Sequence, residues 1–250
     1  LAQLIHLGLM LAAAPLAIGL RQRTEALLAG RRGPALLQPW RDLRRLLRKQ
    51  PVRAENASPL SRHTPTACLA AATVAVALVP SFTLGMAFAP LSDLLVLFGL
   101  LAFCRVAPAL AALEPGTAPA ALAAARTAMF GCLADPALLL VILALGLLAG
   151  TTNLDLLIGL QRQGMLQPLA AAVLAGATLA GLALLQPDAG GLTAEFSGAD
   201  LAVVQLAEAL RQLAWLDLIG ALLLPFGMAE MAGGLLAWGI GIVAWAVRLV

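Results

Sequence analysis

The chain has no tyrosine, aromatic residues make up only 4% of it, and charged residues only 12%. That charged share is about half of what a soluble globular domain carries. Apolar residues account for 61% of the 250 residues, and the mean hydropathy is +0.93. A single compact core of this length cannot remove so much apolar surface from water, so the composition excludes a soluble domain and favours a helical membrane protein.

Metal-binding and repeat signatures are also missing. The three cysteines, Cys68, Cys104 and Cys132, stand far apart among apolar neighbours, and no C-x-x-C motif occurs. Iron–sulfur or zinc ligation by this chain alone is therefore not expected, and we interpret the cysteines as small helix-packing residues. His6 and His63 form no visible metal pair. No internal repeat stands out, which argues against a transporter built from inverted repeats.

What the chain does have is a series of apolar segments. They predict an all-α fold, a polytopic transmembrane bundle of about seven spans forming one integral membrane domain over residues 1–250. We place the spans near Leu4–Leu20, Thr66–Ala89, Leu91–Leu113, Pro119–Gly150, Met165–Leu185, Ala199–Leu224 and Phe226–Val247. Pro80 predicts a kink or an early exit in the second span. The short joint at Pro90 predicts an antiparallel hairpin of the second and third spans.

Positive charge is gathered into one loop, residues 21–64. Between Arg21 and His63 lie eleven of the sixteen Lys and Arg residues, opposed only by Glu25, Asp42 and Glu55. The positive-inside rule places this loop in the cytoplasm and the N-terminus outside. Counting crossings from there, Glu114 and Glu195 lie at the cytoplasmic ends of their spans.

The same loop contains an amphipathic helix. Pro39 is suited to open it, because a helix does not need that N–H in its first turn. One face would carry Trp40, Leu43, Leu46 and Leu47, and the other Arg41, Arg44, Arg45 and Arg48. This pattern predicts a helix lying in the membrane interface, and a simple basic anchor on anionic lipid is the alternative. Nucleic-acid binding is not indicated.

Ionisable residues inside a span are costly, so they usually face a bundle interior or a watery path. Glu208 and Arg211 are three residues apart on one helix face and can pair. Either they take part in ion movement or they simply hold helices together. Asp135 is expected well inside the fourth span, unless it caps a bend before Pro136. Asp93 is expected to cap the third span, whereas Asp217 is placed nearer the outer surface.

Four stretches carry a family resemblance: "GRRGPALLQPWRDLRRLLRK" (Gly30–Lys49), "ALEPGTAPAALAAARTAMFGCLADPALLL" (Ala112–Leu140), "AEFSGADLAVVQLAEAL" (Ala194–Leu210) and "LLLPFG" (Leu222–Gly227). They resemble the complex I subunit 1 family, which includes the membrane anchor subunits of NADH:quinone oxidoreductases, of formate hydrogenlyase and of energy-converting NiFe hydrogenases. The family usually has eight spans, so we expect the recorded C-terminus at Val250 to be truncated.

The resemblance implies a non-catalytic subunit that anchors a hydrophilic redox arm and couples electron transfer to proton or sodium movement. It implies no cofactor in this chain, with a NiFe centre and iron–sulfur clusters in partner subunits. The expected partners are hydrogenase-like large and small subunits, an iron–sulfur subunit, antiporter-like membrane subunits and the lipid of a bacterial or archaeal cytoplasmic membrane. The ion path would use Asp135, Glu195, Glu208, Arg211, Glu114 and Arg126. The docking surface would use Arg31, Arg32, Gly33, Pro34, Gln38, Pro39, Asp42, Arg44 and Arg45.

The branch of the family follows from the same motifs. The "GRRGPALLQP", "LEPGTA" and "SGADLA" forms look closer to the hydrogenase and formate hydrogenlyase branch. The connection "QPDAGGLTAEFSG" before Glu195 is shorter than in either branch, which leaves open whether it forms a full redox cavity. A quinone-binding subunit of a respiratory dehydrogenase is the alternative. A free-standing transporter and a passive anchor without an ion path also remain open.

Overall fold

The computed structural model describes residues 1–53, 58–164, 191–230 and 233–249, and this part of the chain is almost entirely helical. The elements are α1 (Ala2–Leu28), α2 (Gln38–Leu47), α3 (Pro59–Leu78), β1 (Thr83–Leu84), η1 (Ala89–Leu91), α4 (Leu94–Leu113), α5 (Ala118–Ala149), α6 (Leu154–Arg162), η2 (Thr193–Glu195), α8 (Gly198–Leu223), β2 (Ala229–Glu230) and α9 (Gly234–Arg248). The predicted all-α membrane fold is confirmed.

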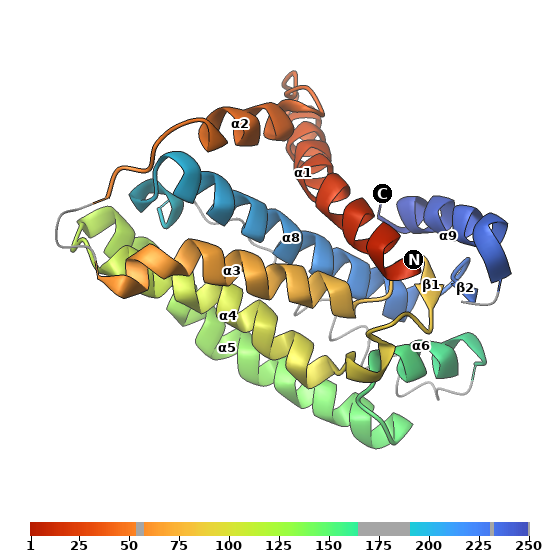
Figure 1. Cartoon of the computed structure of the whole chain (residues 1–250). Coiled ribbons are helices and arrows are strands. Elements are labelled where there is room, and N and C mark those ends of the chain that lie inside the picture. The colour runs from red at the N-terminus through yellow and green to blue at the C-terminus, as the bar shows by residue number, and fades with distance from the viewer. Residues whose placement is uncertain (54–57, 165–190, 231–232, 250) are drawn as a thin grey trace.

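Helix α8 lies at the centre of the bundle. It packs against α1, α2, α3 and α4 along its length, and α4 in turn packs against α5 (Figure 1). We call the end of the bundle that holds Arg53, Glu114, Glu195 and Asp200 the basic end. The opposite end, which holds the β1–β2 pair, α6 and the N-terminus, is called the far end (Figure 1).

Six of the seven predicted spans contain a helix of the structure. The fifth span, Met165–Leu185, falls outside the described residues. Three described helices are long and apolar enough to cross a membrane: α1, α4 and α5. Helix α8, with 26 residues, is also long enough, but four charged residues interrupt it: Asp200, Glu208, Arg211 and Asp217. The most central helix is therefore one of the more polar ones.

Side-chain caps explain several helix starts. The hydroxyl of Ser58 accepts a hydrogen bond from Leu60 N at 3.1 Å at the start of α3, and Asn153 caps α6 in the same way. Asp93 accepts from Leu95 N at 2.7 Å, which confirms its predicted role as the cap of α4. Such caps satisfy backbone donors that have no partner within the helix.

The connection between the second and third spans differs from the prediction. Helix α3 ends at Leu78, just before Pro80, as the proline requires. The expected short joint at Pro90 is wrong, because residues 79–93 form β1, η1 and loops before α4 begins. This segment is held by specific partners. Thr83 and Leu84 pair in parallel with Ala229 and Glu230 of β2, so the chain after α8 returns to the chain after α3.

The predicted amphipathic helix exists as α2. Its apolar face is only partly covered, since Leu43 is buried and Leu46 half-buried, while Trp40 and Leu47 stay exposed. The helix packs on α1 and α8. Trp40 Nε1 donates a hydrogen bond to the carbonyl of Ala12 in α1 at 3.2 Å. We call the positively charged residues 21–64, which include α2, the basic segment. Through α2 this segment is attached to the bundle, and its amphipathic pattern also suits the lipid surface.

Candidate functional site

The central feature of the site is a carboxylate–guanidinium pair inside α8. Arg211 Nε donates to Glu208 Oε2 at 2.8 Å, and Arg211 Nη2 donates to Glu208 Oε1 at 2.6 Å. This is the pair that their spacing predicts. Glu208 lies ten residues beyond the first residue of α8, about 15 Å along the helix axis. Side-chain exposure is 5% for Arg211 and 25% for Glu208, so the acid is the more accessible partner.

The pair is part of a network that reaches α1. Gln212 Nε2 donates to Glu208 Oε1 at 2.8 Å, and Arg21 Nη1 donates to Gln212 Oε1 at 2.8 Å. Arg21 also lies 3.4 Å from Glu25. Both carboxylate oxygens of Glu208 therefore accept hydrogen bonds, which fix the position of the carboxylate.

Glu114 and Glu195 lie together with hydroxyl residues at the basic end. Glu114, at the end of α4, accepts a hydrogen bond from the backbone N–H of Ser58. Glu195 Oε1 accepts from Thr117 Oγ1 at 2.5 Å, just before α5 begins. Both acids are half-buried, and Glu114 Oε2 has no hydrogen-bond partner among the described residues. The predicted placement of both acids at one end of the bundle agrees with this geometry.

At the basic end, two further sets of contacts join the loop after α2 to the start of α8. Arg53 donates to Asp200 from Nε at 2.7 Å and from Nη2 at 2.9 Å. Ser197 Oγ accepts from Val52 N at 2.7 Å and donates to the carbonyl of Val52 at 2.9 Å. The hydrogen bond to Asp200 raises the pKa of Arg53 above its ordinary value. The loop after α2 is therefore fastened to the start of α8.

Asp135 forms a separate pair with Arg105, across the α4–α5 contact. Arg105 is the better covered partner, with side-chain exposure of 11% against 29% for Asp135, and its Nε and Nη1 have no partner in the described part of the chain. Gly131 makes room for the guanidinium, because a Cβ there would lie 2.8 Å from Arg105 Nη2. Within the described residues, no hydrogen bond joins this pair to Glu208.

The structure thus divides the predicted ion path into three groups. Glu114 and Glu195 lie at the basic end, Glu208 and Arg211 inside α8, and Asp135 on α5. Arg126, which the sequence placed on the path, is exposed on α5 and has no ion-pair partner among the described residues. It lies between Leu122 and Met129, both 62% exposed, on the outer side of the helix.

The predicted docking residues gather along the segment from the end of α1 to α2. Arg31, Arg32, Pro34, Arg44 and Arg45 are exposed, and Gly33, Gln38, Pro39 and Asp42 are half-buried. Gln38 Nε2 donates to both Asp42 oxygens at 3.2 Å, and Arg45 Nη2 lies 3.4 Å from Asp42. Asp42 therefore organises the helix, while Arg31, Arg32, Arg44 and Arg45 stay exposed.

The described residues contain no group of three or more His, Cys, Asp or Glu side chains that could hold a metal ion. Cys68 and Cys104 are buried at the α3–α4 contact, where Cys104 Sγ donates to the carbonyl of Cys68 at 3.5 Å. His6 is fully buried. Its Nε2 lies 2.9 Å from the carbonyl of Val76 and its Nδ1 lies 2.7 Å from Ser81 Oγ. The hydroxyl therefore donates to Nδ1 while Nε2–H donates to the carbonyl.

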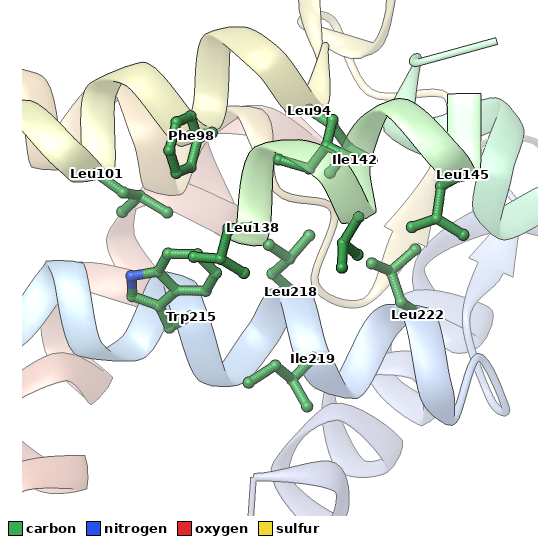
Figure 2. Close-up of a pocket in the computed structure, with 11 residues that line it drawn as sticks. Leu94, Phe98, Leu101, Leu138, Ile142, Leu145, Trp215, Leu218, Ile219 and Leu222 are labelled. Atoms are coloured by element: carbon green, nitrogen blue, oxygen red, sulfur yellow. The ribbon is translucent and has the colours of Figure 1, made fainter. Parts of the chain in front are cut away.

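One apolar pocket lies between α4, α5 and α8. Leucine side chains, Phe98 and the Trp215 ring line it (Figure 2). Its volume of about 40 Å³ is far below the ~150 Å³ of a cavity that holds benzene. This pocket therefore has no room for a quinone ring.

Sequence reasoning missed Arg105, Arg21 and Gln212 as partners of the buried acids. Arg105 carried a usable signal, because a lone arginine in an apolar span needs a carboxylate. Gln212 carried a weaker one, since it follows Glu208 by four residues on the same helix face. Arg21 had none, because only the packing of α1 on α8 brings it near.

These features define a multi-spanning helical membrane subunit with ionisable groups buried along its central helix. The sequence profile of the NADH dehydrogenase family matches residues 1–249, and the chain belongs to this family, whose members resemble complex I subunit 1. The resemblance that the motifs indicated is confirmed.

Two curated relatives come from Escherichia coli strain K12. Formate hydrogenlyase subunit 4 is 31% identical over 262 residues, covering 99% of this chain and 84% of the relative. Hydrogenase-4 component C is 31% identical over 238 residues, covering 89% of this chain and 74% of the relative. Among solved structures, a chain of the membrane-bound sulfane sulfur reductase, an archaeal respiratory membrane complex, has a TM-score of 0.75 and 17% identity. That match covers 100% of this chain and 87% of the other, and it supports the fold.

Proposed function

We propose that the chain is the membrane anchor subunit of a formate hydrogenlyase-type or energy-converting NiFe hydrogenase complex. The observation that carries this proposal is the 31% identity to formate hydrogenlyase subunit 4 over 99% of the chain. In this role the chain docks a soluble redox arm and links electron transfer to proton or sodium movement. The NiFe centre and iron–sulfur clusters belong to hydrogenase-like large, small and iron–sulfur partner subunits, and antiporter-like subunits adjoin it in the membrane.

We further propose that the basic end faces the cytoplasm of a bacterial or archaeal cell and that the exposed arginines of the basic segment hold the arm. Eleven of the sixteen basic residues lie there, which agrees with the positive-inside rule. Replacing Arg44 and Arg45 by glutamate should release the arm during purification of the complex. Arg162→Glu, an exposed far-end arginine, is the matched control. If the arm stays bound to the variant with both charges reversed, the segment does not hold the arm and the alternative, a basic anchor on anionic lipid, is favoured.

Within the membrane, Glu208 is the proposed ion-carrying group, held by Arg211 and Gln212. Glu114 and Glu195 would take the ion in at the basic end, and Asp135 would receive it on the side of α5. In Glu208→Gln, an amide oxygen at the Oε1 position can still accept from Arg211 Nη2 and Gln212 Nε2, but the bond from Arg211 Nε and the charge are lost. We expect the variant complex to assemble and to turn over its redox substrates, while ion translocation into reconstituted vesicles is abolished. Normal translocation would refute the assignment.

The second candidate is a quinone-binding subunit of a respiratory dehydrogenase, which the family match also favours. The two functions differ in a simple measurement. If the complex purified through a tag on this chain contains a NiFe large subunit and evolves hydrogen without added quinone, the first proposal holds. A quinone-site photoaffinity label on this chain, displaced by an inhibitor, would favour the second.

A further inference from the structure

A second group of buried polar side chains lies at the far end of α8, away from Glu208. Asp217 is 3% exposed, and its Oδ1 accepts a hydrogen bond from Trp245 Nε1 in α9 at 3.0 Å. Arg248, one turn after Trp245, donates to the carbonyl of Ser81, and its Cβ would lie 3.7 Å from a Cβ added at Gly220, so it adjoins the turn of α8 that follows Asp217. The sequence placed Asp217 near the outer surface of the membrane, and the structure buries its side chain between α8 and α9 at the far end of the bundle.

Several atoms of this group have no hydrogen-bond partner among the described residues, and solvent does not reach them. They are Asp217 Oδ2, Arg248 Nε and Arg248 Nη1. A buried polar atom left without a partner costs about 1–3 kcal/mol, and more when it is charged. The unpaired atoms include both acceptors and donors, and water is the small ligand that can serve both kinds at once.

The position of Asp217 also continues a pattern along α8. Asp200, Glu208 and Asp217, which we call the α8 charge line, follow one another at intervals of eight and nine residues, about 12 to 13.5 Å along the axis. At about 100° per residue, the nine-residue step places Asp217 on the opposite side of α8 from Glu208. Asp200 is paired with Arg53 and Glu208 with Arg211, but Asp217 has no direct ion pair in the described part of the chain. Gln212, the last residue of the Glu208 network, lies five residues before Asp217, about 7.5 Å away along the helix.

We propose that the Asp217–Arg248 site binds internal water and exchanges protons between the far side of the membrane and the α8 charge line. Water bridges the Asp217 carboxylate to the Arg248 guanidinium, and the carboxylate takes a proton from hydronium to give the acid and water, then returns it. Arg248 stays charged throughout and holds the site in place. This inference rests on the proposed ion-translocating function, but water at the site does not.

The first test measures the water directly, in the wild-type complex. X-ray hydroxyl-radical footprinting oxidises side chains next to bound water even when bulk solvent cannot reach them. Trp245 and Trp215 form a matched pair, because they are 4% and 5% exposed, but Trp245 contacts Asp217 while Trp215 lines the apolar pocket (Figure 2). Trp245 should be oxidised at least tenfold faster than Trp215. Equal, slow oxidation of both rings would show that the site is dry and overturn the proposal.

The second test measures ion translocation by reconstituted complexes carrying Asp217→Asn, Leu236→Ala or Glu208→Gln. The asparagine still accepts the Trp245 hydrogen bond through its amide oxygen but cannot hold an exchangeable proton, so translocation per complex should fall at least tenfold with assembly and redox turnover retained. Leu236→Ala, at an exposed position on the same helix α9, leaves the site intact and should translocate at close to the wild-type rate. If Asp217→Asn only lowers thermal stability while Glu208→Gln blocks translocation, Asp217 has a purely structural role. The inference about Asp217 is then refuted, while the proposed function stands. Normal translocation by Glu208→Gln would instead refute the proposed function.

Discussion

The guanidinium of Arg53 grips both carboxylate oxygens of Asp200, at 2.7 and 2.9 Å, and so ties the loop after α2 to the first turn of α8. Beside this pair, Ser197 bonds the N–H and the carbonyl of Val52. Gly198 comes next, and a Cβ there would lie 2.3 Å from the carbonyl oxygen of Gln50. The "SGAD" motif therefore has a physical meaning: each of Ser197, Gly198 and Asp200 fixes one point of the same junction.

Gly198→Ala should loosen this junction. Gly198 has a φ of +53°, a conformation that L side chains rarely adopt, and the added methyl would press on the Gln50 carbonyl. Backbone strain of this kind costs about 1–3 kcal/mol. We expect a lower melting temperature of the purified chain and weaker retention of partner subunits, measured by size-exclusion chromatography after heating. Gly239→Ala in α9, where no atom of the described part of the chain lies within 4 Å of the added Cβ, should melt like the wild type.

Reversing the Arg53–Asp200 pair tests whether charge or shape matters at the same place. Arg53→Glu sets two carboxylates against each other and should reduce the yield of assembled complex. The double variant Arg53→Glu with Asp200→Arg restores opposite charges and should recover much of that yield. Recovery can be followed by the amount of soluble arm that co-purifies with a tag on this chain. If the single reversal leaves that amount unchanged, the pair has no role in assembly.

Breaking the Arg105–Asp135 pair should destabilise the α4–α5 contact. Arg105→Gln leaves the Asp135 carboxylate without its counter-charge in a largely covered position, at a cost of about 1–3 kcal/mol. Combining it with Asp135→Asn removes the second charge as well and should restore most of the lost stability. A thermal-shift assay on the detergent-solubilised chain measures all three variants. Additive destabilisation in the double variant would mean that the two side chains do not interact.

Gly131→Ala tests the same Arg105–Asp135 pair by changing the residue that makes room for the guanidinium. The new methyl would lie 2.8 Å from Arg105 Nη2 and displace the guanidinium. We expect a melting temperature close to that of Arg105→Gln. Gly99→Ala on the neighbouring helix α4 adds a methyl that has no atom of the described residues within 4 Å, and it serves as the control. A Gly131→Ala variant as stable as this control would show that the guanidinium moves aside at no cost.

Gly19→Ala should shift the basic segment relative to α1. A Cβ at position 19 would lie 2.4 Å from the carbonyl oxygen of Leu36, so the chain that leads into α2 must move outward. Because Trp40 holds α2 to Ala12 by one hydrogen bond, the displacement should weaken that contact and reduce binding of the soluble arm. Pull-down of the arm with tagged variants measures the effect. Gly8→Ala, in the same helix but without a neighbour within 4 Å, should bind the arm normally.

Local patterns predicted most of the fold and the pairs that lie on one helix. Apolar segments located the helices, and the spacing of Glu208 and Arg211 located their ion pair, because both depend on periodicities within a few residues. The pairs between helices were not predictable in this way. Arg105 meets Asp135 and Arg53 meets Asp200 only through tertiary packing, and they are 30 and 147 residues apart. The long 79–93 connection was missed because its contacts lie with His6, α9 and β2.

The charged residues of α8 also bear on how the chain enters the membrane during synthesis. Insertion through the translocon disfavours each arginine or acidic residue near a helix centre by about 2.5–3.5 kcal/mol, while a leucine returns only about 0.3–0.6. With Glu208 and Arg211 near its middle, α8 is a poor insertion signal by itself. The helices that receive it, α1 with Arg21 and α3, are made earlier. Helix α8 therefore depends on the earlier segments α1 and α3 for its insertion into the bilayer. The order of synthesis, with α8 after its packing partners, thus favours formation of this fold.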